Sequence, residues 1–122
     1  DDILKEMNKH FMSKDVAEAA RMLSDHGIHT MGFLLLGGPG ETRDTVEKTL
    51  AFVSGLNLDA LKITVGIRIY PHTKLAKLAV QDGLIGSDDD LLFPKFYMVK
   101  GLEVWLRETV ARHIKEHRNW MM

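Results

Sequence analysis

The apolar and polar positions of the chain follow two different periods, and this pattern predicts helices separated by strands. Apolar residues three and four positions apart, typical of an amphipathic helix, predict a short opening helix over residues 3–7 that ends near Asn8-Lys9-His10. A longer helix follows, capped by Ser13 and stopped by Gly27. Further helices are expected from Thr42 or Asp44 to just before Gly55, from Thr73 to Asp82, and over a terminal stretch with Leu102, Trp105, Leu106, Val110 and Ile114.

The longest strands are predicted between these helices. Residues 28–36 form the first strand, which is apolar on both faces toward its end, so we expect it to be covered on each side as a central or lumen-lining strand. Residues 60–70 form the second, with Leu61, Ile63, Val65, Ile67 and Ile69 on one face and Lys62, Thr64, Gly66, Arg68 and Tyr70 on the other. The apolar face is expected beneath helices. In a parallel sheet the polar face lines a site in which Gly66 leaves room, whereas in an antiparallel sheet it is solvated.

The order of elements predicts the fold class. Strands that alternate with helices indicate βαβ units with right-handed crossovers, and therefore an α/β fold with about two to three parallel strands and about four to five helices. A short strand is expected at residues 96–99, after a polar turn at residues 86–90. The 122 residues are interpreted as a single fragment.

A glycine-rich loop joins the first strand to the next helix. Its residues are Gly37, Gly38, Pro39, Gly40 and Glu41. Glycine lets the backbone turn sharply and approach a ligand closely, and the helix start adds amide N–H groups and a positive dipole end. Such loops hold ligands in many α/β proteins, so a ligand-binding loop and a plain connection have equal weight. Glu41 suits a neutral or cationic ligand or ribose hydroxyls, or it is an acid that complements the helix dipole.

Other side chains offer chemistry, each with a plainer alternative. Arg68 can pair with a ligand carboxylate or bond a neighbouring acidic side chain. Tyr70, which precedes Pro71, can stack on a base or pack within the fold. His113 and His117 share a helix face at a spacing that zinc accepts, but we expect them to complement the negative end of the terminal helix. No metal site and no catalytic residue are therefore assigned.

Composition and charge narrow the functional classes. The chain is 45% hydrophobic and 27% charged, which is typical of one globular domain. A net charge of −1 excludes the electrostatic footprint of a protein that binds nucleic acid or an anionic membrane. The absence of cysteine excludes a disulfide scaffold, a thiol nucleophile and a cysteine-held cluster within these residues. Without an apolar run of ~18 residues or a leader, we expect a cytoplasmic protein, and the start at Asp1-Asp2 predicts a piece of a longer one.

Two blocks of sequence resemble the later half of a radical S-adenosylmethionine enzyme domain. The first is Leu-Leu-Leu-Gly-Gly-Pro-Gly-Glu-Thr at residues 34–42, and the second is Val-Gly-Ile-Arg-Ile-Tyr-Pro-His-Thr-Lys-Leu at residues 65–75. The resemblance covers residues 1–83 and implies an incomplete (β/α) barrel. It also implies that the glycine-rich loop contacts S-adenosylmethionine and that Arg68 and Tyr70 line the lumen. Residues 84–122, a C-terminal extension with an amphipathic helix, are similar to those of members that carry a cobalamin-binding domain.

The departures from the family pattern limit what the chain is expected to do. His72 replaces the glycine that is common in the Tyr-Pro-Gly-Thr block. The Cys-x3-Cys-x2-Cys motif that holds the family's [4Fe-4S] cluster is absent, so the resemblance implies an iron-sulfur oxidoreductase fragment that supplies part of the cofactor wall and is inactive alone. Its partners would be the missing N-terminal half and, through unpaired sheet edges, further copies of itself. The alternative is a non-enzymatic α/β module that binds a small ligand or serves in assembly.

Overall fold

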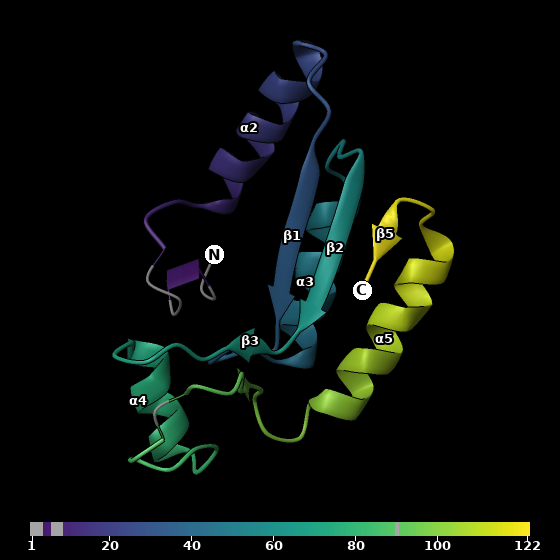
Figure 1. Ribbon diagram of the computed structural model, residues 1–122. Coiled ribbons are helices and arrows are strands. Elements are labelled where there is room, and N and C mark those ends of the chain that lie inside the picture. The colour runs from purple at the N-terminus through teal and green to yellow at the C-terminus, as the bar shows by residue number, and fades with distance from the viewer. Residues whose placement is uncertain (1–3, 6–8, 90) are drawn as a thin grey trace.

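The computed structural model, which describes residues 4–5, 9–89 and 91–122, has an α/β fold (Figure 1). The predicted opening helix lies largely outside the described residues. The elements in chain order are α2 (Ser13–Asp25), β1 (Met31–Leu36), α3 (Arg43–Ser54), β2 (Ala60–Val65), β3 (Ile67–Arg68), α4 (Lys74–Gln81), β4 (Phe96–Tyr97), α5 (Glu103–Glu116) and β5 (Trp120–Met121). Within these ranges, no helix is both long enough and apolar enough to span a bilayer.

The main sheet has three parallel strands in the order β1-β2-β5. Strand β1 pairs with β2 from Met31 opposite Ala60 to Leu36 opposite Val65, as βαβ geometry predicts. The central strand among the described residues is β2, and β1 pairs there with β2 alone, so the central position expected for residues 28–36 belongs to β2. The alternative of a lumen-lining strand stays a prediction. The other neighbour of β2 is β5, which was not predicted because a two-residue strand is too short to show a period.

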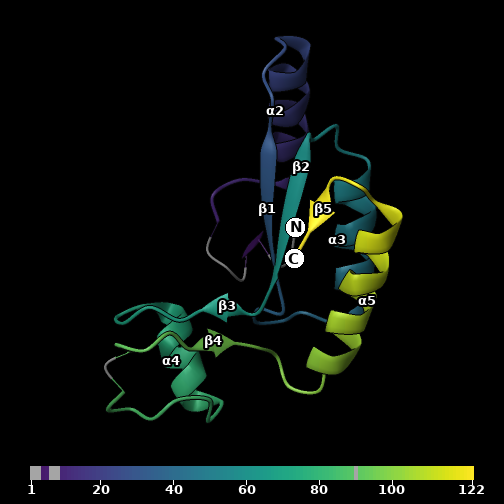
Figure 2. The ribbon, with the colours of Figure 1, turned by 45° about the vertical axis from the view of Figure 1, so that its right-hand side comes forward.

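Helices α3 and α5 pack on one face of this sheet (Figure 2). Strands β1 and β2 turn apolar side chains toward the two helices. The residues that are almost fully buried there are Leu36, Val46, Leu50, Leu61, Ile63, Leu106 and Val110. The predicted apolar face of residues 60–65 is therefore beneath helices, as expected. Burying side chains of this size contributes about 1.5–3 kcal/mol each to stability.

The opposite face of the main sheet is open in the described part of the chain. Phe33 is 71% exposed, and Met31 and Leu35 on the same face of β1 are about half exposed. This corrects the expectation that the first strand is covered on each side. An apolar strand predicts burial, but the packing of the described residues leaves these three side chains exposed.

The second predicted strand is interrupted at Gly66. This residue has a φ of +92°, which glycine adopts without the steric penalty of a Cβ, and the chain leaves the parallel sheet there. Residues 67–68 form β3, which pairs antiparallel with β4. A Cβ on Gly66 would lie 3.4 Å from Cβ of Phe96 and 3.5 Å from the carbonyl oxygen of Tyr97. The space expected beside Gly66 is therefore occupied by β4.

A second, smaller core forms where β3, β4 and α4 lie beyond the end of the main sheet (Figures 1 and 2). Ile69, Ala79, Leu91 and Tyr97 are buried there. Tyr97 also donates a hydrogen bond of 2.8 Å from its hydroxyl to Oδ2 of Asp82, the C-cap residue of α4. The link holds the end of the helix against β4.

Most helix ends follow the predicted capping residues. Thr42 and Thr73 are N-caps, and their hydroxyl oxygens accept hydrogen bonds from the amides of Thr45 (3.2 Å) and Ala76 (3.1 Å). Gly27, with a φ of +70°, ends α2. At the start of α2, however, the cap position is Met12 rather than Ser13, because Asp15 accepts a 2.9 Å hydrogen bond from the Met12 amide.

Candidate functional site

The glycine-rich loop and the break at Gly66 leave the same end of two neighbouring parallel strands. The loop follows Leu36, the last residue of β1, and Gly66 follows Val65, the last residue of β2. The amide of Gly66 donates a hydrogen bond of 2.7 Å to the carbonyl oxygen of Leu36, which ties the two exits together. The C-terminal ends of parallel strands are where α/β folds place ligands.

The first glycine of the loop contacts this chain's own β4–α5 connection. A Cβ on Gly37 would lie 2.6 Å from Sδ of Met98, and the amide of Val99 donates a 2.9 Å hydrogen bond to the Gly37 carbonyl oxygen. The Met98 side chain therefore occupies the space that the absence of a Cβ leaves at Gly37. Gly38 and Pro39 are buried, whereas Gly40, with a φ of +80°, is exposed.

Glu41 is only 5% exposed and belongs to the start of α3. Its Oε2 accepts a short hydrogen bond from the hydroxyl of Thr45. The Thr45 oxygen in turn accepts a 2.8 Å hydrogen bond from the amide of Thr42, which completes a reciprocal cap of the helix. This arrangement favours the plainer of the two interpretations of Glu41, an acid at a helix start.

Arg68 and Tyr70 are exposed and lie beside each other on the segment that follows Gly66. The guanidinium carbon of Arg68 is 5.0 Å from the centre of the Tyr70 ring, and 55% of Tyr70 is exposed. The Tyr70 carbonyl oxygen accepts a 2.7 Å hydrogen bond from the hydroxyl of Thr73, which begins α4. A cation stacked on an aromatic ring is a pair that can meet a carboxylate or a flat ring from solution.

His72 adopts a φ of +62°, in the left-handed region of the backbone that a residue with a Cβ rarely occupies. This is the position at which the resembling family has glycine. The departure noted in the sequence therefore carries a backbone cost, because the turn between Pro71 and Thr73 keeps a glycine-type conformation.

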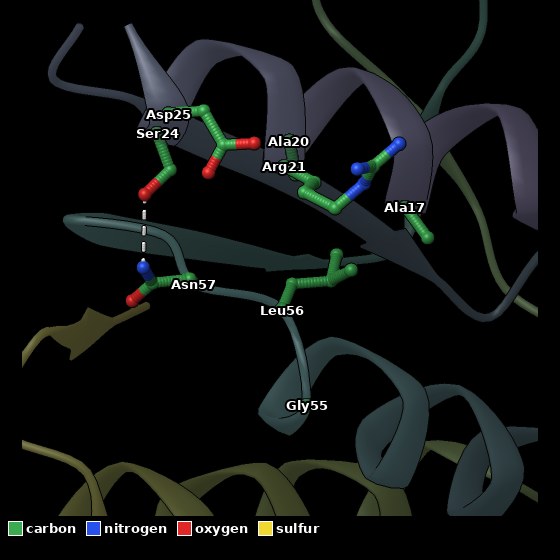
Figure 3. A pocket seen from close by; sticks show the side chains of 8 residues that line it. All are labelled: Ala17, Ala20, Arg21, Ser24, Asp25, Gly55, Leu56 and Asn57. Atoms are coloured by element: carbon green, nitrogen blue, oxygen red, sulfur yellow. Dashed lines mark hydrogen bonds between the residues drawn. The ribbon is translucent and has the colours of Figure 1, made fainter. Parts of the chain in front are cut away.

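A cavity of about 320 Å3 lies elsewhere, between α2 and the turn that precedes β2 (Figure 3). It is lined by Ala17, Ala20, Arg21 and Ser24 of the helix, and by Leu56 and Asn57 of the turn. The side-chain amide nitrogen Nδ2 of Asn57 donates a 2.9 Å hydrogen bond to the Ser24 hydroxyl at its edge. The turn leads into the start of β2, so this cavity is at the end of the sheet opposite the glycine-rich loop.

A cluster at the end of α5 joins the two histidines noted in the sequence to a third residue that the sequence analysis did not consider. The side chains of His113, Glu116 and His117 place their potential metal-ligating atoms within 4.8 Å of one another. The sequence signal was present as a His-x-x-Glu-His run, in which an acid directly precedes the second histidine. The prediction used only the two histidines and so had no third ligand.

Comparison with known proteins finds a similar protein described as an uncharacterized methyltransferase, from Pyrococcus horikoshii. The two are 30% identical over 83 residues, which are 68% of this chain and 18% of that protein. The aligned part thus spans less than a fifth of the relative's length. No protein-family model and no solved structure matches the chain.

Proposed function

We propose that this chain is part of the cofactor-binding wall of a radical S-adenosylmethionine oxidoreductase, with the glycine-rich loop and the Arg68–Tyr70 segment facing one ligand. The observation that carries the proposal is the 2.7 Å hydrogen bond between Gly66 and Leu36, which brings both segments to the same end of a parallel strand pair. The methyltransferase name of the relative supports it, because S-adenosylmethionine is a common methyl donor.

The residues of the site fit S-adenosylmethionine in part. Gly40 is exposed and lies close to the N-terminus of α3, where amide N–H groups can donate hydrogen bonds to oxygen atoms of the ligand. The exposed guanidinium of Arg68 suits the ligand's carboxylate, and the face of Tyr70 suits its adenine. Gly37 and Glu41 would support the site without contacting the ligand, because Gly37 packs against Met98 and Glu41 bonds Thr45.

The iron–sulfur cluster does not fit this chain. Such clusters are held by cysteine thiolates, and the sequence contains none. In the proposed enzyme the cluster would therefore be held by another part of a longer protein, and it would supply the electron for reductive cleavage. What these residues contribute is binding and orientation of the cofactor.

A titration of the isolated chain with S-adenosylmethionine tests the binding step. We expect amide NMR shifts at Gly38, Gly40, Arg68 and Tyr70, and weaker binding in Arg68→Ala. Lys62→Ala is the matched control, because Lys62 is an exposed cation of β2 on the same stretch of chain. Shifts confined to the cavity beside α2, or equal affinity of both variants, would contradict the assignment.

Formation of 5′-deoxyadenosine by the longer protein that contains this sequence tests the function itself. Gly38→Val and Arg68→Ala should lower the yield at least tenfold. Glu47→Ala, at an exposed position of α3, should leave the yield unchanged. Full cleavage activity in both site variants would show that this end of the sheet does not hold the cofactor.

The open face of the main sheet favours a second candidate function, a non-enzymatic assembly module. Phe33 is 71% exposed at the centre of an apolar strand, as expected of a surface that meets a partner. This function predicts association without any response to S-adenosylmethionine, so the same NMR titration separates the two.

A further inference from the structure

We propose that His113, Glu116 and His117 bind a divalent transition-metal ion of the zinc class at the C-terminal end of α5. This inference does not depend on the proposed function, because the cluster lies on a different element from the glycine-rich loop and the Arg68–Tyr70 segment. It adds a binding site to a helix that otherwise serves to cover the main sheet.

The spacing of the ligand atoms fits one ion. His113 and His117 are one helical turn apart, so their rings project from the same face of α5, and Glu116 lies between them. The ligand atoms lie within 4.8 Å of one another. Two donors on a tetrahedral zinc ion lie about 3.3 Å apart, given bond lengths of about 2.0–2.1 Å. Glu116 is exposed, so rotation of its side chain can bring the carboxylate closer to the two rings.

The ring of His117 is oriented for coordination. Its Nδ1 is 2.8 Å from the carbonyl oxygen of His113. A carbonyl oxygen only accepts, so Nδ1 carries the proton and Nε2 carries the lone pair that a metal ion needs. A histidine ligand whose other nitrogen donates to a backbone carbonyl is the usual arrangement in metal sites, because the hydrogen bond sets both the tautomer and the ring orientation.

Trp120 holds the rings of both histidines in place. The His117 ring stacks on Trp120 with centroids 3.8 Å apart and an interplanar angle of 9°, and His113 lies nearly parallel to both rings. Trp120 is itself buried in β5, where it pairs with Leu61 of β2. Stacking engages the ring faces and leaves the ring edges, where the nitrogens lie, for an ion.

One ring nitrogen of His113 is left without a polar contact by the described residues that pack around it. Its Nδ1 is buried and has no hydrogen-bond partner within the described ranges of the chain. A buried polar atom without a partner is destabilising and is rare in folded proteins. An ion bound through this nitrogen would give it the partner that it lacks.

The donor set indicates the class of metal. Two imidazoles and a carboxylate are the borderline ligands that zinc, cobalt and nickel accept, whereas calcium and magnesium prefer oxygen alone. Three protein ligands leave a fourth position of a tetrahedral ion open to water or to a ligand.

The test is a titration of the full, tag-free chain with ZnCl2, followed by calorimetry. We expect one ion per chain, and at least tenfold weaker binding in His117→Gln and in Glu116→Gln. His26→Gln is the matched control, because the His26 Nδ1 lies 2.7 Å from the Met22 carbonyl oxygen at the end of α2, in the same local geometry but outside the cluster. Glu108→Gln, on the exposed side of α5, is the control for the acid.

Fluorescence provides a readout of where the ion is bound. In a Trp105→Phe background the remaining indole is Trp120, and Co2+ bound at His117 should quench its emission in proportion to occupancy. Unchanged emission, or quenching that persists in His117→Gln, would overturn the proposal. So would zinc binding that is equally strong in His117→Gln, Glu116→Gln and His26→Gln, because the ion would then be held elsewhere. Far-UV circular dichroism shows that each variant is folded, and Glu116→Gln, at an exposed position, keeps the test valid if a histidine variant is not.

Discussion

The amide of Gly66 lies 2.7 Å from the carbonyl oxygen of Leu36, and this hydrogen bond joins the exits of β1 and β2. Leu36 still belongs to the parallel register, opposite Val65, whereas Gly66 has already turned out of it with a φ of +92°. A single glycine therefore ends the parallel pairing and starts the antiparallel β3–β4 pair. The glycine-rich loop and the Arg68–Tyr70 segment emerge side by side as a result.

Gly37→Ala should destabilise the protein by about 2–5 kcal/mol. The new Cβ would lie 2.6 Å from Sδ of Met98, and the φ of +98° is unfavourable for alanine. Left-handed strain costs about 1–2 kcal/mol and overpacking about 1–3 kcal/mol. Urea unfolding measures the change.

Gly83→Ala is the matched control for this substitution. Gly83 has a φ of +74°, but nothing lies within 4 Å of an added Cβ, so only the strain of about 1–2 kcal/mol is expected. Shortening the facing side chain with Met98→Ala should reduce the cost of Gly37→Ala toward the same value. Equal costs of Gly37→Ala in both backgrounds would show that Met98 does not fill this space.

His72→Gly should stabilise the protein by up to about 1.6 kcal/mol. The φ of +62° at His72 costs a residue with a Cβ about 1–2 kcal/mol, and the greater freedom of glycine in the unfolded chain offsets about 0.4–1 kcal/mol of the gain. Urea unfolding measures the difference, and His72→Ala, which keeps the Cβ, should show no gain. A loss of stability in His72→Gly would mean that the imidazole makes a stabilising contact that outweighs the strain.

The helices and the parallel pairing were predictable because their signals are local. Thr42 and Thr73 are the N-caps of α3 and α4, whereas Gly27 and Gly83 follow the C-terminal ends of α2 and α4. Each of these roles depends on only a few neighbouring residues. Strands separated by a helix then pair in parallel by a general rule of chain connection. Signals of this kind do not require knowledge of what packs on the element.

Features that depend on distant contacts were not predictable. Ile67 and Ile69 continue the alternation of apolar and polar residues that begins in β2, so the sequence shows no break at Gly66. Phe33 is exposed although its strand is apolar. Whether another element covers a strand depends on distant parts of the chain, and the strand's own residues do not encode it. In the candidate site the same limit applies, because only the fold reveals that Met98 fills the space at Gly37 and that Trp120 aligns His117.

Alkaline pH should weaken the fold through Tyr97. Burial, together with the hydrogen bond to Asp82, raises the pKa of Tyr97 to about 12 from its usual 10.0. The folded state therefore holds the proton more tightly than the unfolded state. This contribution to stability is complete below pH 10 and is lost as the pH rises toward 12.

The measurement is the urea midpoint at several pH values between 9 and 12, compared between the native chain and Tyr97→Phe. Other groups ionise in this range, so the prediction concerns the difference between the two proteins. The native chain should lose more stability than Tyr97→Phe. Asp82→Asn, which removes the carboxylate but keeps a hydrogen-bond acceptor, should bring the tyrosinate absorbance transition of Tyr97 to lower pH. Parallel curves for the native chain and Tyr97→Phe would contradict the assignment.

Phe33→Lys should reduce self-association of the isolated chain. Among the described residues, β1 pairs with β2 on one side only, so its other edge presents unpaired N–H and C=O groups beside an apolar face. A lysine at the centre of that face adds a charge that must be desolvated when two copies meet. Sedimentation velocity at increasing concentration should show larger species for the native chain and a shift toward monomer for Phe33→Lys. Phe93→Lys, at a 77% exposed position outside the sheet, should behave like the native chain, because it leaves the edge of β1 unchanged.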